Sequence, residues 1–187
     1  MLVAIDIKGE GTVTGGGVYQ AGETATLTAT PISGYRFKYF LIGDNPVKDN
    51  PLKIEITDST PDIAVTGVFY VSIEDYLRGR VDFDIPDSVF VPIQMDRGVS
   101  HGQDVSELDS RTVELCYADL LMWATTTASM IQGESESDNG WSHQAQSKTL
   151  SINDKKRLED RAIQIYRQYN DPKSLTGIST TRLKPIW

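Results

Sequence analysis

The hydrophobic period of this chain changes near Val71, and one type of secondary structure cannot satisfy both patterns. Before this position, small apolar residues alternate with threonines over residues 23–30, which is the period-two pattern of a half-buried strand. After it, apolar residues recur at helical spacing, beginning at the helix-start signal Ser72-Ile73-Glu74-Asp75. We therefore predict an α+β chain with two modules: a small all-β module over residues 1–70 and a mainly α-helical domain over residues 71–187 that ends in an extended tail.

Composition narrows the class of protein. The single cysteine, Cys116, excludes an internal disulfide, and one cysteine with two histidines is too few for an ordinary structural zinc site. No apolar run approaches the roughly 20 residues that span a bilayer, and the start Met1-Leu2-Val3-Ala4-Ile5 indicates a first strand rather than a signal peptide. The net charge of −8 disfavours a surface that binds DNA phosphates, but it is compatible with the lining of a channel through which DNA passes without being bound. We expect a protein made in a cytosol, with no membrane segment, metal or cofactor.

In the β module, glycines and prolines mark the turns between short strands. Residues 9–17 are rich in glycine, 31–34 predict a turn, and Asp44-Asn45-Pro46 and Asp49-Asn50-Pro51 predict a loop. Residues 52–56 and 63–69 predict the closing strands. The aromatic residues are expected to fill a small core, with sugar stacking as the alternative role. They are Tyr35, Phe37, Phe40 and Phe69.

These motifs occur in a recognisable order. Gly-Gly-x-Tyr-x-x-Gly-Glu-Thr precedes the threonine-rich strand, and Gly-Tyr-x-Phe, Asn-Pro and Val-x-Gly-Val-Phe follow it. Over residues 5–70 this order resembles the β-grasp-like or Ig-like repeat of bacterial surface proteins, the internalin B-repeat type, with Phe40 where such repeats usually carry tryptophan. The resemblance implies an accessory module that decorates, spaces or adheres, without chemistry of its own.

Four helices are expected after Val71. The first begins at Ser72 and ends near Gly79, and the second opens at Pro86-Asp87 and stops at Gly98. The third is the longest, with Asp104 and Ser106 as competing N-caps, and the last begins at a Ser151/Asp154 capping box and stops at Asp171-Pro172. Two apolar stripes at helical spacing support the third and fourth helices. They are Leu108, Val113, Cys116, Tyr117, Leu120, Leu121 and Ala124, then Leu158, Ala162, Ile165, Tyr166 and Tyr169.

Two segments of the helical domain carry tryptophans that lack an obvious partner there. The polar loop over 130–149 contains Trp141 and His143, and the tail over 172–187 ends in Lys184-Pro185-Ile186-Trp187. An indole in such a segment needs a surface to bury against, which a partner chain can supply; for Trp141 the alternative is that it folds back onto its own helices. The basic residues of the last helix predict a solvated face, with a DNA track as the alternative.

Residues 72–187 resemble the head–tail connector, or adaptor, proteins of tailed bacteriophages, closest to a prophage family. The residues that carry the resemblance are Ser72-Ile73-Glu74-Asp75-Tyr76-Leu77-Arg78-Gly79-Arg80, Asp96-Arg97-Gly98-Val99, Arg111-Thr112, Leu115-Cys116-Tyr117-Ala118-Asp119-Leu120-Leu121-Met122-Trp123 and Gly140-Trp141-Ser142-His143. The resemblance implies a homo-oligomeric ring, expected as a dodecamer, in the neck of a virion assembled in the bacterial cytoplasm. Such a ring docks under the portal protein, extends the DNA channel without binding DNA specifically, and links to a neck or tail-completion protein.

No pattern in the chain supports an enzyme. Asp82, Asp84 and Asp87 lack the glycine and distal glutamate of an EF-hand, and His143 beside Ser142 lacks a nucleophile elbow. The glycine-rich start lacks the Gly-Lys-Ser/Thr of a phosphate loop. We therefore expect a structural virion protein, with a glycan- or receptor-binding surface module anchored by the helices as the alternative. The expected partner-binding residues are Trp141, His143, Leu183, Pro185, Ile186 and Trp187, and the subunit-interface candidates are Arg111, Tyr117 and Trp123.

Overall fold

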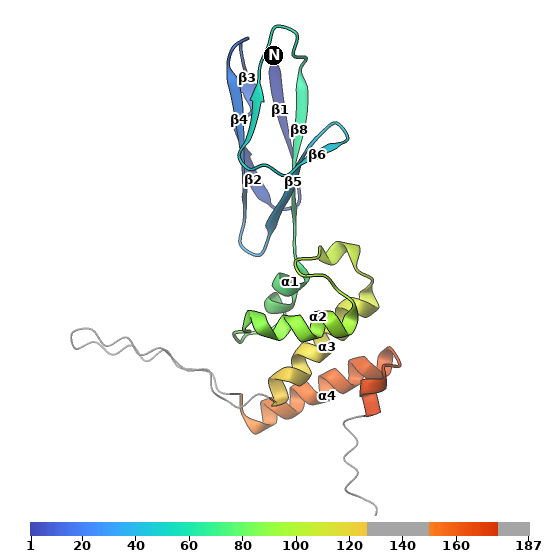
Figure 1. The fold of residues 1–187 in the computed structure, drawn as a ribbon. Coiled ribbons are helices and arrows are strands. Elements are labelled where there is room, and N and C mark those ends of the chain that lie inside the picture. The colour runs from blue at the N-terminus through green and yellow to red at the C-terminus, as the bar shows by residue number, and fades with distance from the viewer. Residues whose placement is uncertain (127–149, 176–187) are drawn as a thin grey trace, which may run out of the picture. The chain divides into compact units, whose positions relative to one another are not determined.

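The structure is a computed structural model that describes residues 1–126 and 150–175. The chain forms two compact units. The first, called the β unit, comprises Met1–Gly79 and Gly102–Glu107; the second, called the helical unit, comprises Arg80–His101 and the chain from Leu108 onwards. The predicted α+β class is confirmed, with an all-β N-terminal part followed by helices (Figure 1).

Eight strands form two sheets in the β unit. They are β1 (Leu2–Lys8), β2 (Gly11–Thr14), β3 (Gly17–Val18), β4 (Thr24–Pro31), β5 (Arg36–Ile42), β6 (Asn45–Val47), β7 (Leu52–Glu55) and β8 (Ile63–Tyr70). The larger sheet has the order β3-β1-β8-β5-β6, with β1 and β8 parallel and the other pairs antiparallel, and the smaller has the order β2-β4-β7. The first strand of the unit, β1, therefore pairs with its last strand, β8.

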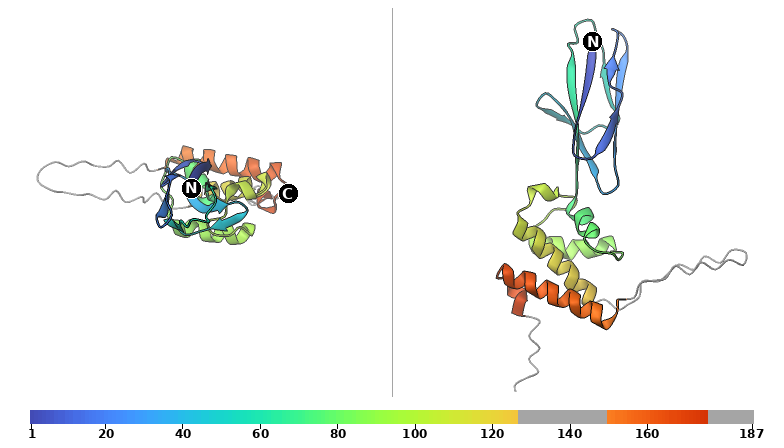
Figure 2. Two further views of the ribbon diagram at one scale, coloured as in Figure 1. Left: turned by 90° about the horizontal axis from the view of Figure 1, so that it is seen from above. Right: turned by 180° about the vertical axis from the view of Figure 1, so that it is seen from behind.

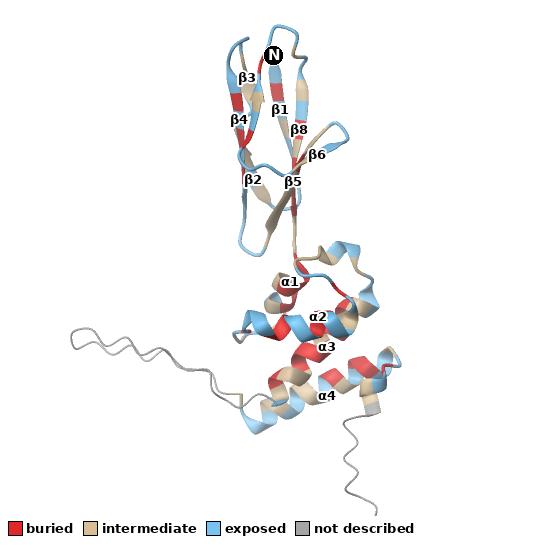
Figure 3. Cartoon of the chain, in the orientation of Figure 1, coloured by how far each residue is buried: buried red, intermediate tan, exposed pale blue. Residues whose placement is uncertain are grey.

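The core of the β unit lies between the two sheets. On β4 every second residue is buried, Ala25, Leu27 and Ala29, while the threonines between them are exposed (Figure 3). Opposite them, Phe40 and Phe69 are almost fully buried and Phe37 packs at the edge, with its ring centroid 4.8 Å from that of Phe40. The expected aromatic core is confirmed, and phenylalanine at position 40 fills it.

One predicted loop is wrong in part. Residues Asn45 and Pro46, expected in a loop, belong to edge strand β6, which pairs with β5. Gly43, with φ of +58°, makes the reversal of direction that lets β6 fold back on β5. Proline is tolerated in β6 because an edge strand can leave one N–H position unpaired.

The β unit also contains α1 (Ile73–Gly79) and a separate strap, Gly102–Glu107, which includes a 3₁₀ turn at Val105–Glu107. Ser72 caps α1 as predicted, since its hydroxyl oxygen accepts a hydrogen bond from the Asp75 N–H at 3.2 Å. The strap is joined to the start of α1 by backbone hydrogen bonds from Ile73 to Gln103 and from Val105 to Val71, both 2.9 Å. That residues 1–70 and 71–187 are separate domains stays a prediction.

The helical unit contains α2 (Phe90–Arg97), α3 (Ser110–Thr126) and α4 (Ile152–Gln168), with 3₁₀ turns at Asp87–Val89 and Pro172–Leu175. The expected stop of α2 and the expected start of α4 are both confirmed. Gly98 takes a left-handed conformation after α2, and Ser151 and Asp154 form a reciprocal capping box. Pro92 lies in the first turn of α2, where its missing N–H leaves no helix hydrogen bond unmade.

The helix α3 is the centre of this unit. It packs against α4 through Leu115, Ala118 and Leu121 on one side and Ala162, Ile165 and Tyr166 on the other (Figures 1 and 2). Its expected N-caps are wrong: Asp109 caps it by accepting hydrogen bonds from the Thr112 N–H and hydroxyl, at 2.9 and 2.7 Å. Asp104 and Ser106 instead bond to each other within the strap, so they are not available to the helix.

The chain after α4 differs from the extended tail that was expected. Residues 172–175 form a 3₁₀ turn because Asp171 caps it: its side chain accepts a hydrogen bond from the Lys173 N–H and its carbonyl accepts one from the Ser174 N–H. The rest of the expected tail, 176–187, and the expected loop over 130–149 lie outside the described residues. None of the helices in residues 1–126 and 150–175 combines the length and apolar character that a bilayer crossing requires.

Candidate interaction site

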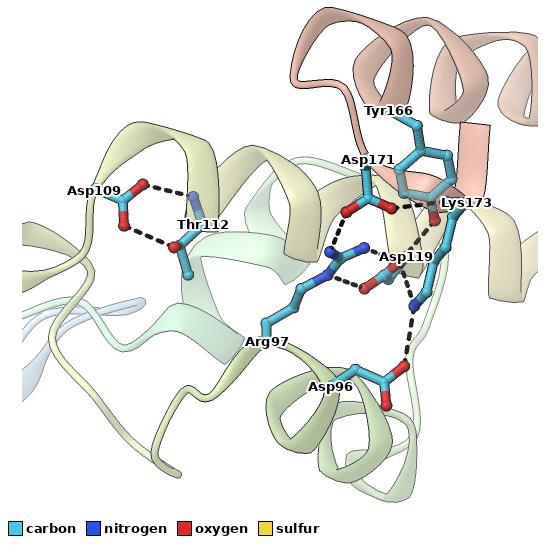
Figure 4. A network of polar contacts seen from close by, with 8 residues as sticks. All are labelled: Asp96, Arg97, Asp109, Thr112, Asp119, Tyr166, Asp171 and Lys173. Atoms are coloured by element: carbon cyan, nitrogen blue, oxygen red, sulfur yellow. Dashed lines mark hydrogen bonds and ion pairs between the residues drawn. The ribbon is translucent and has the colours of Figure 1, made fainter.

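A buried network of charges connects three elements of the helical unit around Arg97. The guanidinium donates to Asp119 on α3 from Nε and Nη2, at 2.6 and 2.9 Å, and to Asp171 after α4 from Nη1, at 2.6 Å (Figure 4). Arg97 itself lies in the last turn of α2. One side chain therefore fixes α2, α3 and the segment after α4 to one another.

Lys173 extends this network to the start of the C-terminal segment. Its ammonium group lies 3.0 Å from a carboxylate oxygen of Asp96 and 3.1 Å from Asp119 Oδ1, which also accepts the Tyr166 hydroxyl at 2.7 Å. The Asp119 carboxylate thus contacts the cations of Arg97 and Lys173 and the hydroxyl of Tyr166, although its side chain is only 5% exposed. Multiple hydrogen bonds of this kind offset the cost of burying a carboxylate.

The ionisation of these groups follows from their burial and their partners. Burial disfavours the charge of Asp171, but hydrogen bonds from Arg97 and the Lys173 N–H outweigh it and hold the pKa of Asp171 below its usual range. Burial likewise opposes the charge of Arg97, but its two carboxylate partners raise the pKa of the guanidinium. Burial raises the pKa of the nearby Cys116 thiol to about 12, so this cysteine stays protonated at neutral pH.

The periodicity and motifs of the sequence do not reveal this network. Asp119 interrupts the apolar surface of α3 between Ala118 and Leu120, and a charged residue at a core position is the one signal that could have revealed it. The sequence pattern indicates Asp171 only as a helix stop and Tyr166 only as part of an apolar helix face. Asp171 and Tyr166 join the network only through tertiary contacts, and Asp171 is 74 positions from Arg97 in the sequence.

The three predicted interface residues lie along α3, and their role in assembly stays a prediction. Arg111 is exposed in the first turn. Tyr117 is half-buried, and the guanidinium of Arg80, which also forms an ion pair with Glu114 at 2.5 Å, covers its ring at 3.7 Å from the centroid. Trp123 is half-buried near the C-terminal end of the helix. The predicted partner-binding residues Trp141, His143, Leu183, Pro185, Ile186 and Trp187 lie outside the described residues.

The basic residues of α4 and the acidic residues before α2 are mainly at the surface. Lys156, Arg157, Arg161 and Arg167 are exposed, as are Asp82, Asp84 and Asp87. Among residues 1–126 and 150–175, no group of three or more metal-ligating side chains is arranged to hold an ion. Exposure of these basic residues is compatible both with the predicted solvated face and with a DNA track, so the choice between the two stays a prediction.

The β unit has a surface groove of about 470 Å³ between strand β5 and the strap. Lys38 crosses it, with its ammonium group 2.9 Å from Asp104 and 2.6 Å from Glu107 and 5.6 Å from the centre of the Tyr70 ring. Lys48 also lines the groove. The groove therefore presents an aromatic side chain beside two cations and two carboxylates, a combination suited to polar ligands with an apolar face.

Comparison with known proteins finds a match for one part of the chain only. No curated protein and no solved structure matches it. Residues 1–72 match the family described as the divergent InlB B-repeat domain, in agreement with the resemblance that the motifs of residues 5–70 predict.

Proposed function

We propose that the chain is a structural subunit of a phage neck: a head–tail connector that forms a ring under the portal, extends the DNA channel and links to a neck or tail-completion protein. The proposal starts from the resemblance of residues 72–187 to such adaptors. Its subunit contacts are proposed to come from Arg111, Tyr117 and Trp123 on α3 and from the segments that contain Trp141 and Trp187.

The observation that carries the proposal is the way both tryptophan-bearing segments are attached to a fixed frame. The segment 127–149 begins directly after α3 and returns shortly before α4, and these two helices share one apolar core. The segment 176–187 follows the 3₁₀ turn Pro172–Leu175. Lys173 of this turn is bonded to Asp96 and Asp119, and the capping residue Asp171 is bonded to Arg97. Attachment to a frame whose geometry is fixed reduces the entropy lost when a segment binds a partner.

Native mass spectrometry of the purified chain, alone and mixed with the portal ring of its phage, tests this proposal. We expect closed rings, and we expect Trp141→Ala and Trp187→Ala each to lower the fraction of chains in rings at least tenfold. The matched control is Val18→Ala, because Val18 is 80% exposed on β3 and belongs to the β unit. A chain that stays monomeric in both samples would overturn the proposal.

A second candidate function is a surface-binding module, in which the β unit recognises a glycan or a protein receptor and the helices anchor it. The match of residues 1–72 to the divergent InlB B-repeat domain favours it, and the groove beside Lys38 and Tyr70 offers a site. Binding of the full chain to host cells would measure it, with Lys48→Glu expected to weaken binding while ring formation is unchanged.

A full-length variant separates the two functions better than removal of residues 1–70. That deletion would remove Arg36 and Lys38, which form ion pairs with Asp75 and Asp104 outside the deleted range. A loss of assembly after deletion would then have two explanations. Unchanged cell binding by Lys48→Glu, or no cell binding by the unaltered chain, would argue against the groove.

A further inference from the structure

The helix α2 carries an apolar strip that faces solvent. Its buried side holds Phe90 and Ile93, while Val91, Pro92 and Met95 are exposed, Val91 to 54% and Met95 to 79%. Residues 91 and 95 are four apart and 92 lies beside them, so the three form one continuous strip. Exposed apolar side chains that cluster on one helix face mark an interaction surface more often than isolated ones do.

The C-terminal segment of the chain begins near the C-terminal end of α2, the helix that carries this strip. Lys173 reaches Asp96, the residue after Met95, at 3.0 Å, and Asp171 is bonded to Arg97 one residue further along α2. The two residues thus hold the start of the segment at the C-terminal end of α2 (Figure 4).

The length and residue order of the segment indicate where its apolar end goes. Residues 176–181 are polar or small apart from Ile178, and the apolar residues Leu183, Pro185, Ile186 and Trp187 lie at the far end. Twelve extended residues span up to ~40 Å, whereas α2, with its 8 residues, is only about 12 Å long. A segment of this length is therefore long enough to place its apolar end beyond its own α2, on a second copy of the chain.

Charge complementarity adds a second argument. The far end carries Arg182 and Lys184, and the chain just before α2 carries the exposed Asp82, Asp84 and Asp87. A segment that lies along the strip toward the N-terminal end of α2 brings its cations to these carboxylates. The strip and the segment are different parts of one chain, so their contact between copies is heterologous and can close into a ring.

We propose that residues 182–187 of one copy dock on the Val91–Pro92–Met95 strip of a second copy, with Trp187 and Ile186 as the apolar anchors. This inference rests on the proposed ring. It specifies the surface on which the C-terminal segment binds and assigns it to the neighbouring copy.

Site-specific photo-crosslinking identifies the occupant of the strip without altering the segment. A benzoylphenylalanine replaces Met95 in the full chain, and ¹⁵N-labelled and unlabelled chains are mixed until native mass spectrometry finds rings of mixed mass. We expect crosslinked peptides in which position 95 of a labelled chain is joined to residues 182–187 of an unlabelled chain, or the reverse. The same probe at Val18, an equally exposed apolar position of the β unit, should give no crosslink to residues 182–187.

The outcomes separate this inference from the proposed function. Rings that form while the probe crosslinks elsewhere, or only to residues 182–187 of its own chain, would overturn the inference and leave the connector proposal standing. A chain that forms no ring would overturn the connector proposal, and this inference with it.

A pair of substitutions gives an independent measurement. We expect Met95→Asp to lower the ring fraction at least tenfold, because it places a charge on the strip. Ile152→Asp, at a position 88% exposed in the first turn of α4, should leave the ring fraction within twofold of the unaltered chain. Equal assembly by the two variants would overturn the docking site.

Discussion

The guanidinium of Arg97 donates two hydrogen bonds to the carboxylate of Asp119, at 2.6 and 2.9 Å, where the two side chains are 11% and 5% exposed. A planar guanidinium matches a carboxylate in this two-point geometry, which lysine cannot reproduce. The same guanidinium also binds Asp171. The pair is therefore the point at which α2, α3 and the start of the C-terminal segment are held together.

Replacement of Arg97 should destabilise the helical unit more than any exposed substitution. In Arg97→Met, the carboxyl groups of Asp119 and Asp171 stay buried without their main partner, at a cost of about 3–5 kcal/mol in the free energy of unfolding. Urea unfolding followed by helical circular dichroism measures this cost. The control is Arg111→Met on exposed α3 surface, expected to change stability by less than about 0.5 kcal/mol. Equal effects of the two substitutions would show that the network contributes little.

Acid should weaken the helical unit through Asp171. The folded-state pKa of this carboxyl lies below its unfolded value, so its contribution to stability is present above the unfolded pKa of about 3.9 and is lost as the pH falls through the folded pKa. Urea titrations at a series of pH values from about 6 down to about 2, which includes the range in which carboxyl groups titrate, measure this loss. As the pH is lowered, the free energy of unfolding should fall less steeply in Asp171→Asn than in the unaltered chain. Asp84→Asn, an exposed control, should retain the original slope.

The strap should be coupled energetically to strand β5. Lys38 and Asp104 are 2.9 Å apart and their side chains are 26% and 11% exposed. A double-mutant cycle of Lys38→Ala and Asp104→Ala should give a coupling free energy of about 1 kcal/mol. A cycle of Asp104→Ala with Lys53→Ala, an exposed lysine on β7, should be additive. Additivity in both cycles would mean that this ion pair does not hold the strap.

Two glycines of the β unit separate the cost of backbone conformation from the cost of a collision. Gly15 and Gly22 have similar φ values, +96° and +91°, which a side chain adopts at a cost of about 1–2 kcal/mol. A Cβ atom on Gly15 would collide with the Thr26 carbonyl, whereas nothing lies within 4 Å of one on Gly22. Thermal unfolding should therefore show a larger loss of stability in Gly15→Ala than in Gly22→Ala. Similar losses would exclude the collision as a contributor.

Features set by short stretches of sequence were predictable. The threonine alternation of β4, the Ser151/Asp154 capping box and the left-handed Gly98 each depend on a few consecutive residues whose conformational preferences agree. The error at Asn45-Pro46 arose because a turn signal and an edge strand overlap there, and only pairing with β5 distinguishes them.

The sequence alone determined where the chain changes from strands to helices, because the spacing of apolar residues must match the period of the element that buries them. It also determined the aromatic core of the β unit, both ends of α1, the end of α2 and the start of α4. Only the tertiary structure decided that the strap packs with the β unit and that Arg97 meets Asp119, Tyr166, Asp171 and Lys173. Such contacts join residues distant in the chain, and a charge in a sequence does not reveal whether water or a buried partner will stabilise it.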